Sequence, residues 1–480
     1  MYKKMKRTIN ILIAALAGVF TLPSCSDWLD VTPNTDLPAK ELFTTANGFQ
    51  SALAGLYISM TEENIYGKNL SFGLTDQLVQ MYDWMPDNMT DRNNVYVYDR
   101  ETSGGYNTKG KLANIWRTQY NVIANANNLL KWWDLNGEVA ILDSVTRNMI
   151  RGEALALRAF LHFDLLRGWG PMNYAGDVKA REMKCMPYRI NADQSKLPLL
   201  QANEVVASII SDLMTARECL SYEKELDLGS DLNKRCFRFN YHAINAMLAR
   251  VYNYAGEKDS AALYAQMVIE GCGLTLQTSN DDDPILSKEV ILGLNMFELV
   301  DNLSEYFAVG EKMNTKYYLN ISTLDWIFAP SSLESEDMRA RGNAFYRSNE
   351  DQMAISLKYV DNRSGIIPLI RLPEMYYIAC EAAEDGKEAA IYVNSVRNKR
   401  GYSKSNDVSC GTDELRIAAL NSEFCKEFYG EGQYFWFLKS HGIVGKLGHC
   451  ADVELTKERF VFPLPDAEVE YGWTSESEEL

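Results

Sequence analysis

Two groups of aromatic residues in irregular parts of the chain have the composition of a sugar-binding surface. The first group, within residues 82–98, mixes rings with amide and charged side chains: Tyr82, Trp84, Asn88, Arg92 and Tyr96. The second group follows much later in the sequence: Tyr317, Tyr318 and Trp326. Sugars present flat C–H faces and many hydroxyl groups, so a binder needs exposed rings with polar side chains at their rim. We predict all of these residues as candidate ligand contacts, although each ring could instead belong to the hydrophobic core.

Metal-binding and catalytic patterns give a weaker signal. His441, His449 and Cys450 lack the paired spacing of zinc ligands, and 281–283, an Asp triplet, lacks the turn glycine and distal glutamate of a calcium loop. The sequence contains no GxxxxGKS/T, GxGxxG, HExxH or GxSxG motif, the commoner nucleotide, zinc-protease and hydrolase fingerprints. We therefore predict no metal site, no cofactor and no catalytic residue.

A surface glycoside hydrolase is the enzymatic alternative. Such an enzyme needs two carboxyl groups that face each other across a cleft. The chain has 65 acidic residues, so pairs such as Glu62 with Glu63, or Asp83 with Asp87, are available. Nothing in their sequence neighbourhood distinguishes them from solvated charges.

The elements that would position these residues are mostly helices. Two long stretches, 61–108 and 272–370, break the helical pattern and are rich in Asn, Asp, Gly, Ser and Tyr. Inserts of this length are usually functional or disordered, and their Tyr and Trp content argues against disorder. Helical periodicity is present near residues 41–60, 110–135, 143–169, 201–221, 240–255, 258–271, 371–385, 387–400 and 412–440.

Residues inside the helical segments are expected to serve packing. The spacing of large and small residues between Leu248 and Ala261 matches part of a tetratricopeptide unit, although a generic helical hairpin gives the same pattern. Arg158 and His162, with Glu153 and Asp164 nearby, are expected to form a buried, hydrogen-bonded cluster. Six helical aromatic residues are predicted to pack in the core: Tyr120, Trp132, Trp133, Phe160, Phe163 and Trp169.

The first 24 residues have the features of a secretory signal. Basic residues between Lys3 and Arg7 precede the apolar run Ile11–Phe20, which as a helix would be about 15 Å long, half of a bilayer core. The run ends in Leu22-Pro23-Ser24-Cys25, which resembles a bacterial lipoprotein box. We predict a signal peptide over residues 1–24, a lipidated Cys25 and a tether over residues 25–40. Ordinary signal cleavage is the alternative.

The composition excludes wholesale disorder and disfavours nucleic-acid binding. Hydrophobic residues make up 46% of the 480 residues, enough for a packed core. A net charge of −17 and a pI near 4.9 would repel phosphate backbones. The cysteines after Cys25 are widely spaced and form no CxxC pair, so isolated buried thiols are expected.

Six segments, spread over nearly the whole chain after residue 24, form a recognisable series: CSDWLDVTP from Cys25, RGEALALRAFLHFDLLRGWGPM from Arg151, IRLPEMYYIACEAA from Ile370, VNSVRNKRG from Val393, EFYGEGQYFWFLK from Glu427 and FPLPDAEV from Phe462. They resemble the successive signature segments of the SusD/RagB family and occur in that family's order. Asp337-Met338-Arg339 also resembles the family's short Asp-x-Arg element. Tyr434 and Phe437 replace an arginine and an aspartate that are common in the family, which points to a divergent subgroup and predicts packed aromatic rings there.

This resemblance implies a mostly α-helical protein, with one domain over residues 41–480. Tetratricopeptide-like helical pairs would form its scaffold, and an irregular, loop-rich part would bind the ligand. It also implies a palmitate-bearing lipoprotein on the outer face of the outer membrane. Members of the family capture oligosaccharides, or peptides in some branches, without converting them, and act with a SusC-like TonB-dependent transporter. A pure interaction module without a ligand is a further alternative.

Overall fold

The computed structural model describes residues 39–83, 95, 108–193, 195–232, 234–297, 299–304, 306–309, 317–328, 337–341, 343–360, 365–447 and 450–470. The predicted signal peptide, Cys25 and most of the tether lie outside these residues. Four candidate ligand contacts also lie outside them: Trp84, Asn88, Arg92 and Tyr96. Their roles stay predictions.

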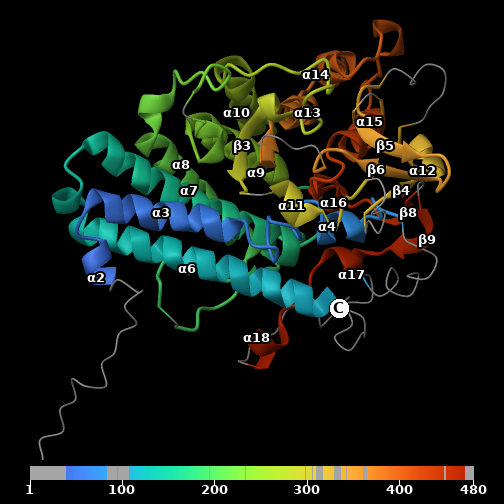
Figure 1. Ribbon diagram of the computed structural model, residues 1–480. Coiled ribbons are helices and arrows are strands. Elements are labelled where there is room, and N and C mark those ends of the chain that lie inside the picture. Colours follow the sequence, from blue (N-terminus) through green and yellow to red (C-terminus); the bar gives the residue numbers. More distant parts are fainter. Residues whose placement is uncertain are drawn as a thin grey trace, which may run out of the picture.

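Long helices packed side by side form the larger part of the molecule (Figure 1). The scaffold consists of α2 (Ala39–Leu42), α3 (Ala46–Met60), α6 (Thr108–Ala140), α7 (Ser144–Trp169), α8 (Ala202–Cys219), α9 (Tyr241–Ala255), α10 (Lys258–Gly271), α13 (Leu372–Ala382) and α14 (Gly386–Lys399). Neighbours in sequence pair in space: α6 with α7, α7 with α8, α9 with α10, and α13 with α14. The predicted fold class, mostly helical with a scaffold of helical pairs, is confirmed.

From Gly152 onward, helix α7 is buried on all sides, because α6, α8, α3, α9 and β1 (Lys184–Met186) pack around it. Every residue from Gly152 to Trp169 is buried. At its start, the Asp143 side chain accepts a hydrogen bond of 2.8 Å from the Thr146 amide and caps the helix. A Cβ atom on Gly152 would lie 3.0 Å from the Cys219 Cβ, so the glycine permits the close approach of α8. The predicted packing roles are confirmed for Phe160, Phe163 and Trp169, which are fully in the core, and for Tyr120, Trp132 and Trp133, which pack against it.

The two irregular inserts contain short helices and strands. An isolated antiparallel bridge between Asp83 and Tyr318 joins the first insert to the second. Strand β3 pairs antiparallel with β7, and β6 lies between β4 and β5, also antiparallel. The elements are α4 (Leu74–Leu78), β3 (Val290–Asn295), α11 (Leu299–Leu303), β4 (Leu319–Asn320), α12 (Ile321–Ile327), β5 (Phe345–Ser348), β6 (Met353–Ser356) and β7 (Ile366–Arg371).

The helical stretch predicted over residues 412–440 is divided in the structure. Gly430 and Gly432 adopt positive φ angles of 75° and 71° in the turn between α15 and α16, and Gly432 directly precedes α16. The elements of this part are α15 (Asp413–Glu427), α16 (Gln433–Ser440), β8 (Gly445–Leu447), β9 (Cys450–Leu455), α17 (Lys457–Phe460) and α18 (Asp466–Glu470). The smaller elements are β1 (Lys184–Met186), β2 (Leu200–Gln201) and the 3₁₀ turns η3 (Ala180–Glu182), η4 (Ser221–Glu223), η5 (Arg235–Phe237), η6 (Ser287–Glu289) and η7 (Lys404–Asn406).

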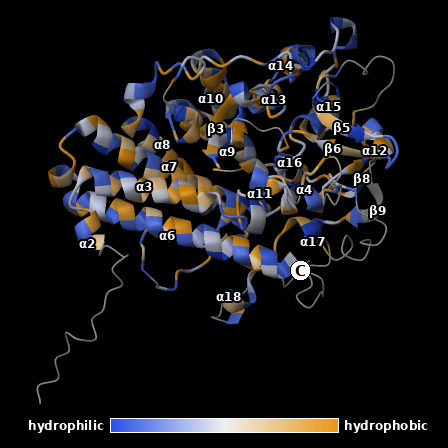
Figure 2. Ribbon diagram, viewed as in Figure 1, coloured by the Kyte–Doolittle hydropathy of each residue, from blue (hydrophilic) through white to orange (hydrophobic). Residues whose placement is uncertain are grey.

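The hydrophobic core runs through the scaffold and continues under the inserts. Strand β3 and helix α9, near the centre, are coloured mostly hydrophobic in Figure 2. Seven cysteines are unpaired, and all of them except Cys236 are buried, as expected for isolated thiols: Cys185, Cys219, Cys236, Cys272, Cys380, Cys410 and Cys425. No helix in the described part of the chain has both the length and the apolar character needed to cross a membrane.

Candidate functional site

The structure brings the two predicted aromatic groups together. The Asp83 amide donates a hydrogen bond of 2.8 Å to the Tyr318 carbonyl, and the Asn320 amide donates one of 2.7 Å to an Asp83 carboxylate oxygen. These bonds place Tyr82 beside Tyr317 and Tyr318, although more than 200 residues separate them in sequence. The contact is made where the two inserts meet.

Three of these rings belong to the core, which corrects the prediction that they form an exposed sugar platform. Tyr82, Tyr317 and Tyr318 expose only 2%, 6% and 3% of their surface. The Tyr82 and Tyr317 rings stack at 4.5 Å between centroids, and the Tyr82 hydroxyl donates to the Phe72 carbonyl at 2.8 Å. Buried rings and strand pairing thus close the junction of the inserts. Trp326 on α12 is 53% exposed and is the described candidate ring that reaches the surface.

Charged residues from separate signature segments meet in a buried ion-pair network. Arg400 is fully buried and donates to both oxygens of Glu427 at 2.9 and 2.8 Å. It also donates to both oxygens of Glu289, at 3.0 and 2.7 Å. Arg371, 1% exposed, donates to Glu427 at 2.8 Å and to both oxygens of Glu431 at 2.8 and 2.9 Å. The network fixes β7, α14 and α15 relative to one another.

The predicted Asp-x-Arg element extends this network. Arg339 donates to Asp337, to Glu423 at 2.7 Å and to Glu427 at 3.1 Å. Burial alone would raise the pKa of Glu423, but Arg339 and Arg397 outweigh it and lower that pKa to about 2. For the same reason Arg400 and Arg371 hold the pKa of Glu427 well below its usual range. These charges therefore persist at neutral pH and serve the scaffold.

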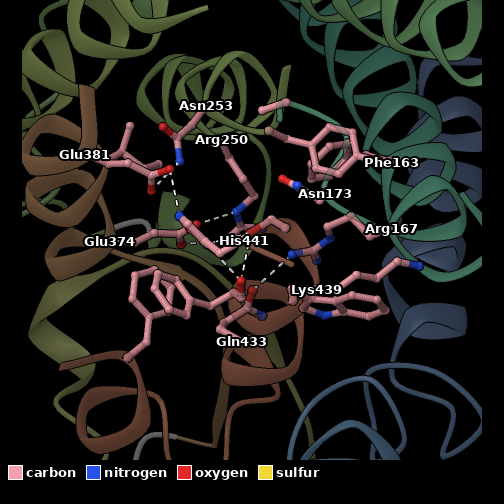
Figure 3. Close-up of a pocket in the computed structure, with 17 residues that line it drawn as sticks. Phe163, Arg167, Asn173, Arg250, Asn253, Glu374, Glu381, Gln433, Lys439 and His441 are labelled. Carbon is pink, nitrogen blue, oxygen red and sulfur yellow. Dashed lines mark hydrogen bonds and ion pairs between the residues drawn. The ribbon is translucent and has the colours of Figure 1, made fainter. Parts of the chain in front are cut away.

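A cavity of about 200 Å³ lies between α7, α9, α13 and α16 (Figure 3). Its walls combine aromatic and aliphatic side chains with paired charges. Arg250 donates to the two oxygens of Glu374, each at 2.6 Å, and Nε2 of His441 lies 2.9 Å from Glu381. Arg167 reaches across to Gln433 at 3.2 Å. The labelled residues around the cavity are Phe163, Arg167, Asn173, Arg250, Asn253, Glu374, Glu381, Gln433, Lys439 and His441.

Ser440, His441 and Glu381 resemble a hydrolase triad in composition, but the hydrogen bonds oppose that role. The His441 Nδ1 atom lies 2.9 Å from the Phe437 carbonyl and 3.1 Å from the Ser440 hydroxyl. A carbonyl only accepts, so Nδ1 carries a proton. Burial opposes a second proton on the ring, but Glu381 outweighs burial and raises the pKa of His441. The Ser440 hydroxyl donates to the Phe437 carbonyl at 3.0 Å, so its proton is directed away from the ring and His441 is not placed as its base.

The carboxylates of the cavity also lack the arrangement of a glycoside hydrolase. Such an enzyme needs a carboxyl group whose pKa is raised, so that it can donate a proton. Burial would raise the pKa of Glu381, but His441 and Asn253 lower it, and both Glu374 oxygens accept from Arg250. The amides and paired charges of the cavity walls can hold hydroxyl groups by hydrogen bonding.

The sequence singled out none of these cavity residues as ligand contacts. Helices α7, α9, α13 and α16 supply most of them, and Arg167 and Gln433 are 266 positions apart. The available signal was a charged residue inside an otherwise apolar helix, such as Arg167, Arg250 or Glu374. His441, considered in sequence only as a zinc ligand, pairs with Glu381, and His449 lies outside the described residues.

The predicted polar cluster on α7 is confirmed as buried and hydrogen-bonded, with a different pairing for its acids. Arg158 holds Asp212 with two bonds of 2.7 Å, and His162 donates from Nδ1 to the Arg158 carbonyl at 2.8 Å. Burial lowers the pKa of His162 to about 3, so the ring is neutral. The two acids pair with other residues. Glu153 forms ion pairs with Arg235 and Arg238, and Asp164 accepts from Arg167.

The two substitutions in the EGQ segment are packed as predicted. Tyr434 and Phe437 are each 3% exposed. The Phe437 ring stacks on Phe424 with 4.4 Å between centroids and an angle of 24°. Aromatic packing therefore holds α16 against α15 at these positions.

Comparisons with known proteins agree with this architecture. A SusD-like family model described as "Starch-binding associating with outer membrane" matches residues 27–253, and one described as "SusD family" matches residues 344–439. SusD-like protein P2 from Formosa agariphila is 28% identical over 278 residues, which are 56% of this chain and 46% of that protein. A SusD-like protein from Bacteroides ovatus is 25% identical over 288 residues, 57% of this chain and 46% of that protein. The chain thus spans about half the length of the curated relatives it matches.

Solved structures share the fold. A SusD superfamily protein from Bacteroides thetaiotaomicron matches with a TM-score of 0.69 and 21% identity, covering 89% of this chain and 98% of that chain. A SusD-like carbohydrate binding protein from Bacteroides vulgatus matches with a TM-score of 0.67 and 18% identity, covering 89% and 96%. The matches to both family models, the relatives and the fold lead to one conclusion: the chain belongs to the SusD/RagB family.

Proposed function

We propose that the protein is a cell-surface lipoprotein that captures oligosaccharides and delivers them to a SusC-like TonB-dependent transporter in the outer membrane. The observation that carries this proposal is the match of residues 27–253 to the family model described as starch-binding and associated with the outer membrane. The signal sequence and Cys25 support the lipid anchor. The protein acts without a cofactor and without converting its ligand.

The ligand surface lies at the junction of the inserts. Buried Tyr82, Tyr317 and Tyr318 form a rigid base there, and Trp326 provides an exposed ring on α12. Trp84, Asn88, Arg92 and Tyr96 belong to the first insert, which the Asp83–Tyr318 bridge ties to the second. A ring that covers about 50 Å² of a sugar face contributes roughly 1 kcal/mol, so two or three rings give weak, reversible capture.

The test measures binding of the purified full chain to a glycan array and a peptide library. We expect glycan binding, weakened about fivefold in Trp326→Ala, which is what a loss of roughly 1 kcal/mol gives, and retained in the matched control Tyr222→Ala, whose ring is 44% exposed on η4. Peptide binding without glycan binding would select the peptide-binding alternative. New reducing ends after incubation with glycans would select the glycoside hydrolase.

Three further measurements address the remaining parts of the proposal. Mass spectrometry of the mature N-terminus should find acylated Cys25, and Cys25→Ser should release the protein from the outer-membrane fraction. Affinity purification from the native host should recover the TonB-dependent transporter with the parent chain. Recovery of the transporter together with a failure to bind any glycan or peptide would leave only an interaction module.

A further inference from the structure

Four aliphatic side chains are exposed together where α6 turns into α7. Leu135 and Val139 lie one helical turn apart on α6, Leu142 lies in the connection, and Val145 lies in the first turn of α7. Their exposed fractions are 61%, 83%, 88% and 47%. Figure 2 shows the hydrophobic colouring at this end of the molecule. Single exposed aliphatic residues are ordinary, but a contiguous group marks a surface that contacts something.

The chain enters the described fold at this same end. Phe43, just after α2, stacks on Trp132 of α6 with 5.8 Å between ring centroids. The Asn136 side chain donates to the Phe43 carbonyl at 3.5 Å. Figure 1 shows α2 next to the α6–α7 connection. These contacts fix the entry point within one or two helical turns of Leu135 and Val139.

The length of the preceding chain limits how far this end can lie from a lipid anchor. Cys25 precedes Ala39 by fourteen residues. Fourteen residues span at most about 50 Å even when fully extended. An anchor at Cys25 therefore keeps the α6–α7 connection near the lipid surface, and a weak apolar contact there gains from the high effective concentration that a tether provides.

The chemistry of the four residues favours lipid over a protein partner. Binding energy in protein interfaces is concentrated in Trp, Tyr and Arg, with Leu and Val under-represented. The group here is purely aliphatic, and Val139, Ala140, Ile141 and Leu142 form a run without a charge. Glu138 and Asp143 flank the run and are exposed, which limits the contact to the shallow interfacial layer.

We propose that the α6–α7 tip, formed by Leu135, Val139, Leu142 and Val145, rests on the lipid surface of the membrane that anchors the protein. This inference rests on the lipid anchor of the proposed function and adds an orientation to it. Helix α12, which carries Trp326, lies at the opposite end of the molecule (Figure 1). Contact at the tip would hold the ligand surface away from the bilayer, toward the exterior.

The test uses acylated full-length protein reconstituted into phosphatidylethanolamine–phosphatidylglycerol vesicles, with and without brominated acyl chains. Trp132 and Trp133 lie one turn before the tip, and the Trp133 indole donates to the Arg147 carbonyl at 3.0 Å. We expect brominated lipid to quench the tryptophan fluorescence of the parent. Val139→Glu/Leu142→Glu should lose this quenching, whereas Ile391→Glu/Leu415→Glu, with residues 65% and 49% exposed on α14 and α15, should keep it.

Each outcome separates this inference from the proposed function. Equal quenching of the parent and the tip variant, with both proteins in the vesicle fraction, would overturn the inference and leave the anchor intact. An unmodified Cys25 with protein only in the supernatant would overturn the anchor and the inference together. Loss of transporter recovery in the tip variant, without lipid quenching in the parent, would assign the tip to a protein partner and overturn the lipid contact. Unchanged glycan binding by the tip variant shows that the ligand surface is intact.

Discussion

Removing Arg400 should reveal how strongly the buried ion-pair network stabilises the fold. The Arg400 guanidinium is fully buried and makes two bonds to Glu427, two to Glu289 and one of 2.9 Å to the Gln277 carbonyl. In Arg400→Met the two carboxylates stay buried. Glu427 keeps Arg371 at 2.8 Å, but the Glu289 ion pair with Arg371 is longer, at 3.4 Å. Glu289 thus becomes an undercompensated buried charge.

The expected loss of unfolding free energy follows from the partners that Glu289 and Glu427 keep after Arg400 is removed. Breaking a buried ion pair by removing one partner costs about 3–5 kcal/mol, because the remaining charge is stranded in a medium of low polarity. Such a loss is a large fraction of the ~5–15 kcal/mol that stabilises a typical native protein. Urea unfolding of Arg400→Met at pH 7, followed by tryptophan fluorescence and far-UV circular dichroism, should therefore show a much lower midpoint than the parent.

A surface pair gives the matched control. Arg347 lies 3.8 Å from Asp325, and both side chains are about 40% exposed, at 41% and 43%. Arg347→Met should cost at most about 1 kcal/mol, because solvent screens an exposed pair. The double change Arg400→Met/Glu289→Met should recover part of the lost stability, because it removes the stranded charge together with its partner. If Arg400→Met lowers the unfolding free energy no more than Arg347→Met does, the reasoning about the network is wrong.

Three further outcomes can be measured by the same unfolding assays. Tyr317→Ala should cost about 3–5 kcal/mol, because it empties a buried ring position; a loss below 1 kcal/mol would contradict a core role. His441→Gln should lower the melting temperature at pH 5.5 but hardly at pH 9. The pKa of His441 is raised in the folded protein, so its ion pair with Glu381 stabilises the fold below the unfolded pKa of about 6.5, and this stabilisation is lost as pH rises through the folded pKa. An equal loss at both pH values would rule out an ionised pair. Gly432→Ala should lower the free energy of unfolding by more than ~1 kcal/mol, because the φ angle of Gly432 is 71° and an added Cβ atom would lie 2.5 Å from Oγ1 of Thr75. The control Gly55→Ala should be neutral or stabilising, because no atom lies within 4 Å of the added Cβ.

The helices could be predicted from sequence because their signals are local. Apolar periodicity and side-chain caps such as Asn240, which accepts from the Ala243 amide at 2.9 Å, mark where helices begin. The division between α15 and α16 escaped prediction because the aromatic and apolar pattern continues across it. The turn between the two helices depends on positive φ angles at Gly430 and Gly432, which glycine adopts without strain.

The candidate site was harder to predict because composition does not distinguish a buried ring from an exposed one. Tyr317 and Trp326 belong to the same insert, yet the first is 6% exposed and the second 53%. The bridge between Asp83 and Tyr318 draws the residues before β4 into the core, whereas Trp326 lies on the exposed face of α12, a helix that buries Leu324 and Ile327. Pairing between residues so distant in sequence leaves no local pattern. The prediction of a sugar platform was therefore wrong for the buried tyrosines and stays a prediction for the residues outside the described part.

The location of the signature residues explains why the family can be assigned while the ligand cannot. Arg371, Arg400 and Glu427 carry the resemblance in three separate segments, and each is at most 1% exposed. Residues so placed cannot touch an oligosaccharide, and their charges are paired with one another. They preserve the geometry of β7, α14 and α15, on which the inserts are mounted. Ligand preference must then depend on exposed side chains such as Trp326, which the scaffold network does not constrain. Exchanging the inserts alone between family members, with Arg371, Arg400 and Glu427 unchanged, should transfer ligand specificity if the scaffold and the ligand surface are separate. If the transfer also required changes in the ion-pair network, this separation of roles would be wrong.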